Sequence, residues 1–113
     1  MGLIYLGQED HERAVVLFQK AIEADPQFAN AFGHLGLVYY KQRKYEEAIT
    51  NFEKAIELGV QSAEYYYELG WSYAFFDKCE KAVPYFDAAV RLDPNAQPAW
   101  EGLDYCEAQG EGE

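Results

Sequence analysis

Residues 31–57 read AFGHLGLVYYKQRKYEEAITNFEKAIE, and residues 65–91 read YYYELGWSYAFFDKCEKAVPYFDAAVR. The two stretches align without a gap at a separation of 34 residues. Leu-Gly, then Tyr, and then Ala, Phe and Ala recur at the same places in both. A repeat of this length indicates stacked helical hairpins, because one hairpin buries its apolar face only against its neighbours.

The same period extends to the start of the chain. The matching columns are Gly2, Gly36 and Gly70; Tyr5, Tyr39 and Tyr73; Ala14, Ala48 and Ala82; Phe18, Phe52 and Phe86; and Ala21, Ala55 and Ala89. Their spacing places one apolar stripe on each of two facing helices. The Gly and Ala columns are small, so that two helix backbones can approach closely.

Helix boundaries also follow from the sequence. Asp25-Pro26 and Asp93-Pro94 end a helix, because a proline disfavours helical geometry in the residue before it. The middle repeat has Gly59 instead, which can supply a left-handed cap. The predicted helices are 1–7, 11–24, 29–42, 45–58, 63–76, 79–91 and 97–109.

The period and this pattern of Leu-Gly, Tyr, Ala, Phe, Ala and Pro resemble the tetratricopeptide repeat (TPR). The resemblance implies an all-α fold, a right-handed α-solenoid of antiparallel helix pairs. Arg43 and Asp77 stand where that family often has a turn glycine, so these turns are expected to be strained. Residues 1–113 are then a single domain, made of a truncated first repeat (1–28), a second (29–62), a third (63–96), a capping helix (97–109) and a frayed tail (110–113).

The two ends of the array differ in sequence. The first repeat lacks most of its first helix and is expected to expose an apolar edge. In the last helix, Asp104 falls in the Gly column and Glu107 in the Tyr column. A further helix would bury both carboxylates unpaired, which is costly, so this helix is interpreted as a cap with a polar outer face.

In this family the first helix of each pair lines a concave groove, and the resemblance places a peptide there. The predicted groove residues are Asn30, His34, Leu37, Tyr40, Lys41, Glu64, Tyr67, Glu68, Trp71, Phe75, Glu101 and Tyr105. Trp71 is the most informative, because the packing stripe does not require it, and exposed aromatics are typical binding hot spots. The alternative is that Trp71 and Phe75 pack between adjacent repeats and are mostly internal.

Charge narrows the class of partner. With 9 Lys and Arg against 20 Asp and Glu, the net charge is −11, which disfavours nucleic acid and anionic membranes. A well-known TPR subclass binds chaperone carboxylates through cations, and Glu64 and Glu68 occupy two of those slots here. An apolar or basic protein segment is the expected partner. The acidic surface alternatively serves solubility alone.

The sequence offers no catalytic or metal-binding motif, so we expect a non-enzyme without cofactors. His34 with Glu64 or Glu68 is the only conceivable acid–base pair. Cys79 and Cys106 match no motif and are interpreted as small reduced thiols, consistent with the cytoplasm. Two alternatives to peptide binding are self-assembly into a homo-oligomer through the N-terminal edge and targeting of a larger enzyme.

Overall fold

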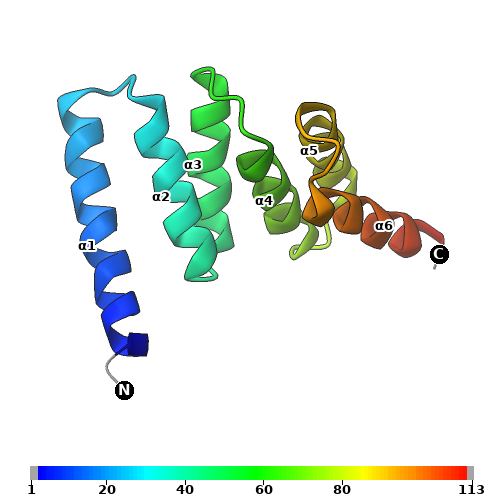
Figure 1. Ribbon diagram of the computed structural model, residues 1–113, viewed down its shortest axis with the longest axis horizontal. Helices are drawn as coiled ribbons and strands as arrows, with labels where there is room; N and C mark the ends of the chain where they lie inside the picture. Colours follow the sequence, from blue (N-terminus) through cyan, green and yellow to red (C-terminus); the bar gives the residue numbers. More distant parts are fainter. Residues whose placement is uncertain (1–2, 112–113) are drawn as a thin grey trace. The chain divides into compact units, whose positions relative to one another are not determined.

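The computed structural model describes residues 3–111, and the side-chain surroundings of residues 11–109, as helices joined by short connections (Figure 1). These residues form α1 (Leu3–Ala24), α2 (Ala29–Lys41), α3 (Tyr45–Glu57), α4 (Ala63–Ala74), α5 (Cys79–Leu92) and α6 (Gln97–Glu111), with no strand among them. The all-α prediction is confirmed. The chain forms two compact units: the first, up to Val60, contains α1, α2 and α3, and the second, from Gln61, contains α4, α5 and α6.

In the first unit, α2 and α3 pack small residues against a single large ring. Ala48, Phe52 and Ala55 of α3 are fully buried. A Cβ atom added to Gly36 of α2 would come within 2.7 Å of Cδ1 of Phe52. The Phe ring therefore occupies the space that the glycine leaves, as the repeat columns predict.

The second unit repeats this packing and extends it to a third helix. Ala82, Phe86 and Ala89 of α5 are fully buried, and a Cβ on Gly70 of α4 would lie 2.7 Å from Cε1 of Phe86. A Cβ on Gly102 of α6 would overlap the same ring from another direction. Phe86 is thus held between α4 and α6, which makes it the centre of this unit.

Three helices end in the same hydrogen-bonded cap. After α3, Gly59 has a φ of 106°, and the N–H groups of Gly59 and Val60 donate to the carbonyls of Ile56 and Ala55. The turns after α2 and α4 bend the same way at Arg43 (φ 63°) and Asp77 (φ 59°). Left-handed geometry is unfavourable for a residue with a Cβ, so the expected strain is present at both turns.

The helix bounds agree with the sequence prediction to within two residues, except in α1. Two helices were predicted at 1–7 and 11–24, whereas α1 runs without a break from Leu3 to Ala24. Residues 8–10 are Gln, Glu and Asp, which contain neither a proline nor a left-handed residue to form a turn. The first repeat is therefore represented by one long helix rather than by a helix pair.

The C-terminal helix is also longer than predicted. α6 continues to Glu111, so Gly110 and Glu111, which were assigned to a frayed tail, are helical. The remaining two residues of that tail, 112–113, lie outside the described residues.

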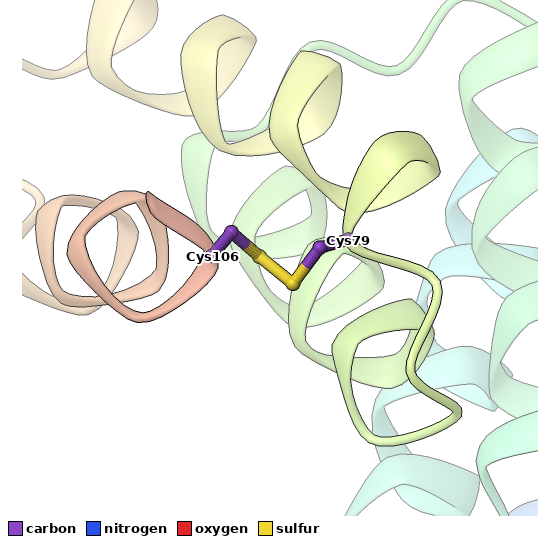
Figure 2. Close-up of a disulfide and its surroundings, with 2 residues drawn as sticks. All are labelled: Cys79 and Cys106. Atoms are coloured by element: carbon purple, nitrogen blue, oxygen red, sulfur yellow. A yellow bond between two sulfur atoms is a disulfide. The ribbon is translucent and has the colours of Figure 1, made fainter. Parts of the chain in front are cut away.

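A disulfide joins Cys79 to Cys106, which corrects the interpretation of both as reduced thiols (Figure 2). Cys79 is the first residue of α5 and Cys106 lies on α6, and their Cα atoms are 5.4 Å apart. That separation is usual for a disulfide. Their sequence separation of 27 matches no recognised cysteine motif, because the packing of α6 across the start of α5 brings the two sulfurs together.

Candidate functional site

Three aromatic side chains join α4 to α6 in the second unit, and we call Phe75, Trp71 and Tyr105 the aromatic row. The ring centroid of Trp71 lies 5.7 Å from that of Phe75 and 5.5 Å from that of Tyr105. The indole N–H of Trp71 donates a hydrogen bond of 3.0 Å to the carbonyl of Pro98, at the start of α6. The row therefore fixes the position of α6 beside α4.

The aromatic row is packed at its centre and exposed at its ends. Trp71 is half-buried and meets Phe86 edge-on, with ring centroids 5.4 Å apart. Phe75 is 51% exposed and Tyr105 is 37% exposed. Two partly exposed rings thus contact an indole that is itself held in place.

Trp71 and Phe75, for which the sequence predicts one shared role, differ in the structure. Trp71 has a packing role, against Phe86 and Pro98, that the repeat columns did not require. Phe75 follows the last residue of α4 and is half exposed. The exposed contact surface consequently centres on Phe75 and Tyr105, not on Trp71.

The other end of α4 is acidic. Glu64 is exposed, Glu68 is buried, and Tyr67 lies half-buried between them in sequence. Burial raises the pKa of the Tyr67 phenol above its usual value, and the carboxylates of Glu64, Glu68 and Asp93 raise it further. Three carboxylates therefore act on this part of the surface, and their field is negative.

Two residues of this region were not identified from the sequence. Asp93 was interpreted only as the end of a helix, although its charge reaches Tyr67. The repeat pattern does not indicate Gly102, because the glycine column of this repeat falls on Asp104. Gly102 shares its own repeat column with His34 and Glu68, and it faces Phe86. A glycine at a position where the other repeats carry larger side chains was the available signal in the sequence.

On α6, Glu101 is exposed one helical turn before Tyr105, so its carboxylate flanks the aromatic row. The preceding residue, Trp100, is 45% exposed and donates its indole N–H to the carbonyl of Pro94 at 2.8 Å. Both tryptophans thus hold the backbone that leads into α6.

The predicted groove residues of the first unit all lie on α2. The ring of His34 stacks on Phe18 of α1 with centroids 5.2 Å apart, and Tyr40 meets Tyr45 of α3 edge-on at 5.6 Å. These contacts give both side chains a packing role. The remaining three are Asn30 and Lys41, which are exposed, and Leu37, which is half-buried.

A shallow hollow of about 450 Å³ lies along α1. Among the described residues, Glu12, Arg13, Val16 and Leu17 line it. Val16 is 48% exposed and Leu17 is 65% exposed. This face of α1 is therefore an apolar surface that α2 does not cover.

Within residues 3–111, no group of three or more His, Cys, Asp and Glu side chains has the arrangement of a metal site. None of the helices in that range combines the length and apolarity that a membrane crossing requires.

Family models match most of the chain. A model described as the tetratricopeptide repeat matches residues 27–95, and a second, described as a TPR repeat, matches residues 2–43. No curated protein sequence matches the chain.

Solved structures match the fold closely. The chain is 30% identical to YrrB, described as a TPR protein with an unusual peptide-binding site; the match has a TM-score of 0.85 and covers 96% of this chain and 56% of YrrB. It is 26% identical to MamA, with a TM-score of 0.85, over 98% of this chain and 66% of MamA. The first TPR of Spaghetti, bound to the HSP90 peptide SRMEEVD, shares the fold at 21% identity and a TM-score of 0.83, over 99% of this chain and 88% of that one. The chain thus spans little more than half of the length of YrrB.

Proposed function

Because the chain belongs to the tetratricopeptide-repeat family and is a protein-interaction module of that type, we propose that its second unit binds an apolar and basic segment of another protein. The observation that carries this proposal is the exposure of Phe75 and Tyr105, which both contact a Trp71 held by its hydrogen bond to Pro98. YrrB, the 30% identical relative, is described as having a peptide-binding site.

The aromatic row supplies the apolar part of the recognition. Rings that are held before binding lose little conformational entropy when a partner covers them, so their contact area favours affinity. Trp71 is held by its hydrogen bond to Pro98, and Phe75 and Tyr105 lie against it. An apolar side chain of the partner would pack across the two exposed rings.

The acidic end of α4 supplies the charged part. Glu64 and Phe75 are eleven residues apart on or beside one helix, which corresponds to about 16 Å. An extended peptide rises by about 3.3 Å per residue, so it covers this distance in about five residues. We therefore propose a lysine or arginine about five residues from the apolar anchor.

An acidic segment is disfavoured at this surface. The HSP90 peptide bound to the first TPR of Spaghetti reads SRMEEVD and ends in acidic residues. Here Glu64 on α4 and Glu101 on α6 are exposed, and their charges would repel such a peptide. The peptide charge that we propose for this chain, positive, is thus opposite to that of the acidic peptide bound to the first TPR of Spaghetti.

We propose a non-catalytic role in an oxidising compartment. The site presents aromatic rings and carboxylates without a nucleophile beside a base. The Cys79–Cys106 disulfide favours an oxidising environment over the reducing cytoplasm that the sequence suggested.

The experiment compares two labelled peptides by fluorescence anisotropy. One alternates leucine and lysine, and its counterpart carries glutamate in place of every lysine. We expect the basic peptide to bind and the acidic one to bind far more weakly.

Phe75→Ala should lower the affinity for the basic peptide by at least about tenfold. Phe76→Ala is the matched control, because Phe76 is also exposed (45%) but lies outside the aromatic row. Equal binding of both peptides, or an equal effect of both variants, would show the proposal to be wrong.

A second candidate is self-assembly through α1. The observation that favours it is the hollow lined by Val16 and Leu17, which is apolar and exposed. Light scattering over a range of concentrations tests it. Self-assembly is supported if the molar mass rises with concentration and Leu17→Glu removes this rise. A monomer mass at every concentration argues against it.

A further inference from the structure

The disulfide lies immediately beside the aromatic row. Cys106 follows Tyr105 on α6, and its sulfur is bonded to Cys79 at the start of α5 (Figure 2). Neighbouring residues of a helix point in directions about 100° apart, so α6 presents Tyr105 to Trp71 and Cys106 to α5. One covalent bond thus anchors the helix that carries an exposed ring of the proposed site.

Apart from this bond and the contacts of Trp71 with Pro98 and Tyr105, α6 is held by small buried side chains. Its buried residues include Ala99, Gly102 and Cys106. Its large side chains Trp100 and Tyr105 remain 45% and 37% exposed. Because hydrophobic stabilisation grows with the apolar area removed from water, α6 gains little from packing alone.

The pair α4 and α5 is held differently. Leu69 of α4 and Phe86 of α5 are both fully buried, and Val90 adds a further buried apolar side chain. Tyr85 of α5 also stacks on Tyr66 and Tyr73 of α4, so this pair keeps contacts that do not involve α6, and loss of the disulfide is expected to act first on α6.

We propose that the Cys79–Cys106 disulfide is a redox lock on the peptide-binding surface, an inference that rests on the proposed function. In the oxidised protein α6 is fixed, and Tyr105 and the Pro98 carbonyl stay against Trp71. Reduction releases α6 from the start of α5. The aromatic row then loses one exposed ring and the hydrogen bond that holds Trp71, and affinity for the basic peptide falls.

The reductant is a dithiol, and the exchange is balanced. A thiolate of the dithiol attacks Sγ of Cys79, because Cys79 is partly exposed whereas Cys106 is 6% exposed. The sulfur–sulfur bond of the protein breaks, Cys106 leaves as a thiolate, and a mixed disulfide forms on Cys79. The second thiol of the reductant displaces Cys79 and closes its own disulfide. Two electrons pass to the protein, and two protons complete its thiols.

The test uses the full chain, oxidised, reduced with thioredoxin as the dithiol, and as a Cys79→Ser/Cys106→Ser variant. Hydrogen exchange reports the protection of each helix, and anisotropy reports binding of the leucine–lysine peptide. We expect reduction to lower the affinity by about tenfold or more. We also expect α6 to lose protection while α4 and α5 keep theirs. The variant should behave as the reduced protein does, with or without dithiol. Reoxidation should restore peptide affinity and α6 protection in the native protein but not in the variant.

Three results would overturn the lock. They are unchanged protection of α6 after reduction, loss of protection throughout α4 and α5, and a disulfide that the dithiol does not reduce. Failure of the oxidised protein to bind the peptide is a different result, since it refutes the proposed function. Hydrogen exchange in α6 would still decide whether the disulfide controls the protection of this helix.

Discussion

Gly102 faces the ring of Phe86 so closely that a Cβ atom at this position would overlap it. Phe86 is fully buried, so its ring has no free space into which to move. The approach of α6 to α5 therefore depends on a missing methyl group.

Gly102→Ala is expected to destabilise the second unit. Overpacking typically costs about 1–3 kcal/mol, and the better helix propensity of alanine offsets about 1 kcal/mol of this. Chemical denaturation followed by circular dichroism measures the net loss. Glu107→Ala, at an exposed position of the same helix, is the control and should leave stability nearly unchanged. If Gly102→Ala proved more stable than the native chain, the close contact with Phe86 would be wrong.

Reversing the charge of Glu64 should change binding without changing the fold. Glu64 is exposed, and its carboxylate contributes to the negative field around Tyr67. Glu64→Lys is expected to weaken binding of the basic peptide by about threefold to tenfold at low salt, because rim charges act mainly on association. The difference should shrink as salt is added, since exposed charges are screened. Glu57→Lys, an exposed substitution in the first unit, is the charge-matched control.

The left-handed turns predict opposite effects of glycine and alanine. Arg43→Gly should raise the free energy of unfolding by about 0.5 kcal/mol, because relief of strain exceeds the extra entropy of the unfolded chain. Asp77→Gly should change it less, since aspartate tolerates this conformation better than arginine does. Gly59→Ala should lower it by about 1 kcal/mol, although nothing lies within 4 Å of the added Cβ. Thermal or urea unfolding of the three variants ranks them, and the reverse ranking would contradict the backbone geometry.

Alkaline pH should destabilise the protein through two tyrosines. Burial, and then the charges of Glu64 and Glu68, raise the pKa of Tyr65 and Tyr67 above their usual 10.0. Between the usual and the raised pKa, the native state keeps protons that the unfolded chain releases. The stabilisation is therefore complete below pH 10 and is lost as pH rises above it. Urea unfolding at pH about 9 and about 11 should show a smaller loss for Tyr65→Phe/Tyr67→Phe than for the native chain. Equal losses would exclude this linkage.

The repeat packing could be predicted from the sequence because it depends on local complementarity. A small residue at Gly36 or Gly70 and a large one at Phe52 or Phe86 recur at a fixed period, and each pair meets as expected. The family and the all-α fold follow from these columns. The family resemblance indicated the turns at Arg43 and Asp77, and helix-cap chemistry indicated Gly59; all three residues have a positive φ.

Other features depend on contacts that no periodicity records. The disulfide needs the register of α6 against α5, which the spacing of Cys79 and Cys106 does not give. The role of Trp71 depends on a carbonyl at Pro98, and a backbone acceptor has no signature in side-chain patterns. Trp71→Ala would remove packing on Phe86 together with a ring of the site, so Phe75→Ala is the better probe of binding.

Both tryptophans donate their indole N–H groups to main-chain carbonyls, Trp71 to Pro98 and Trp100 to Pro94. A main-chain acceptor is present whichever side chain the residue carries. Saturation mutagenesis should therefore give different results at the two ends of each hydrogen bond. Substitutions at Pro94 and Pro98 should be tolerated wherever the backbone path is kept, and substitutions of the tryptophans should not be tolerated. The sequence of the segment that precedes α6 can in this way change during evolution while the position of α6 is kept.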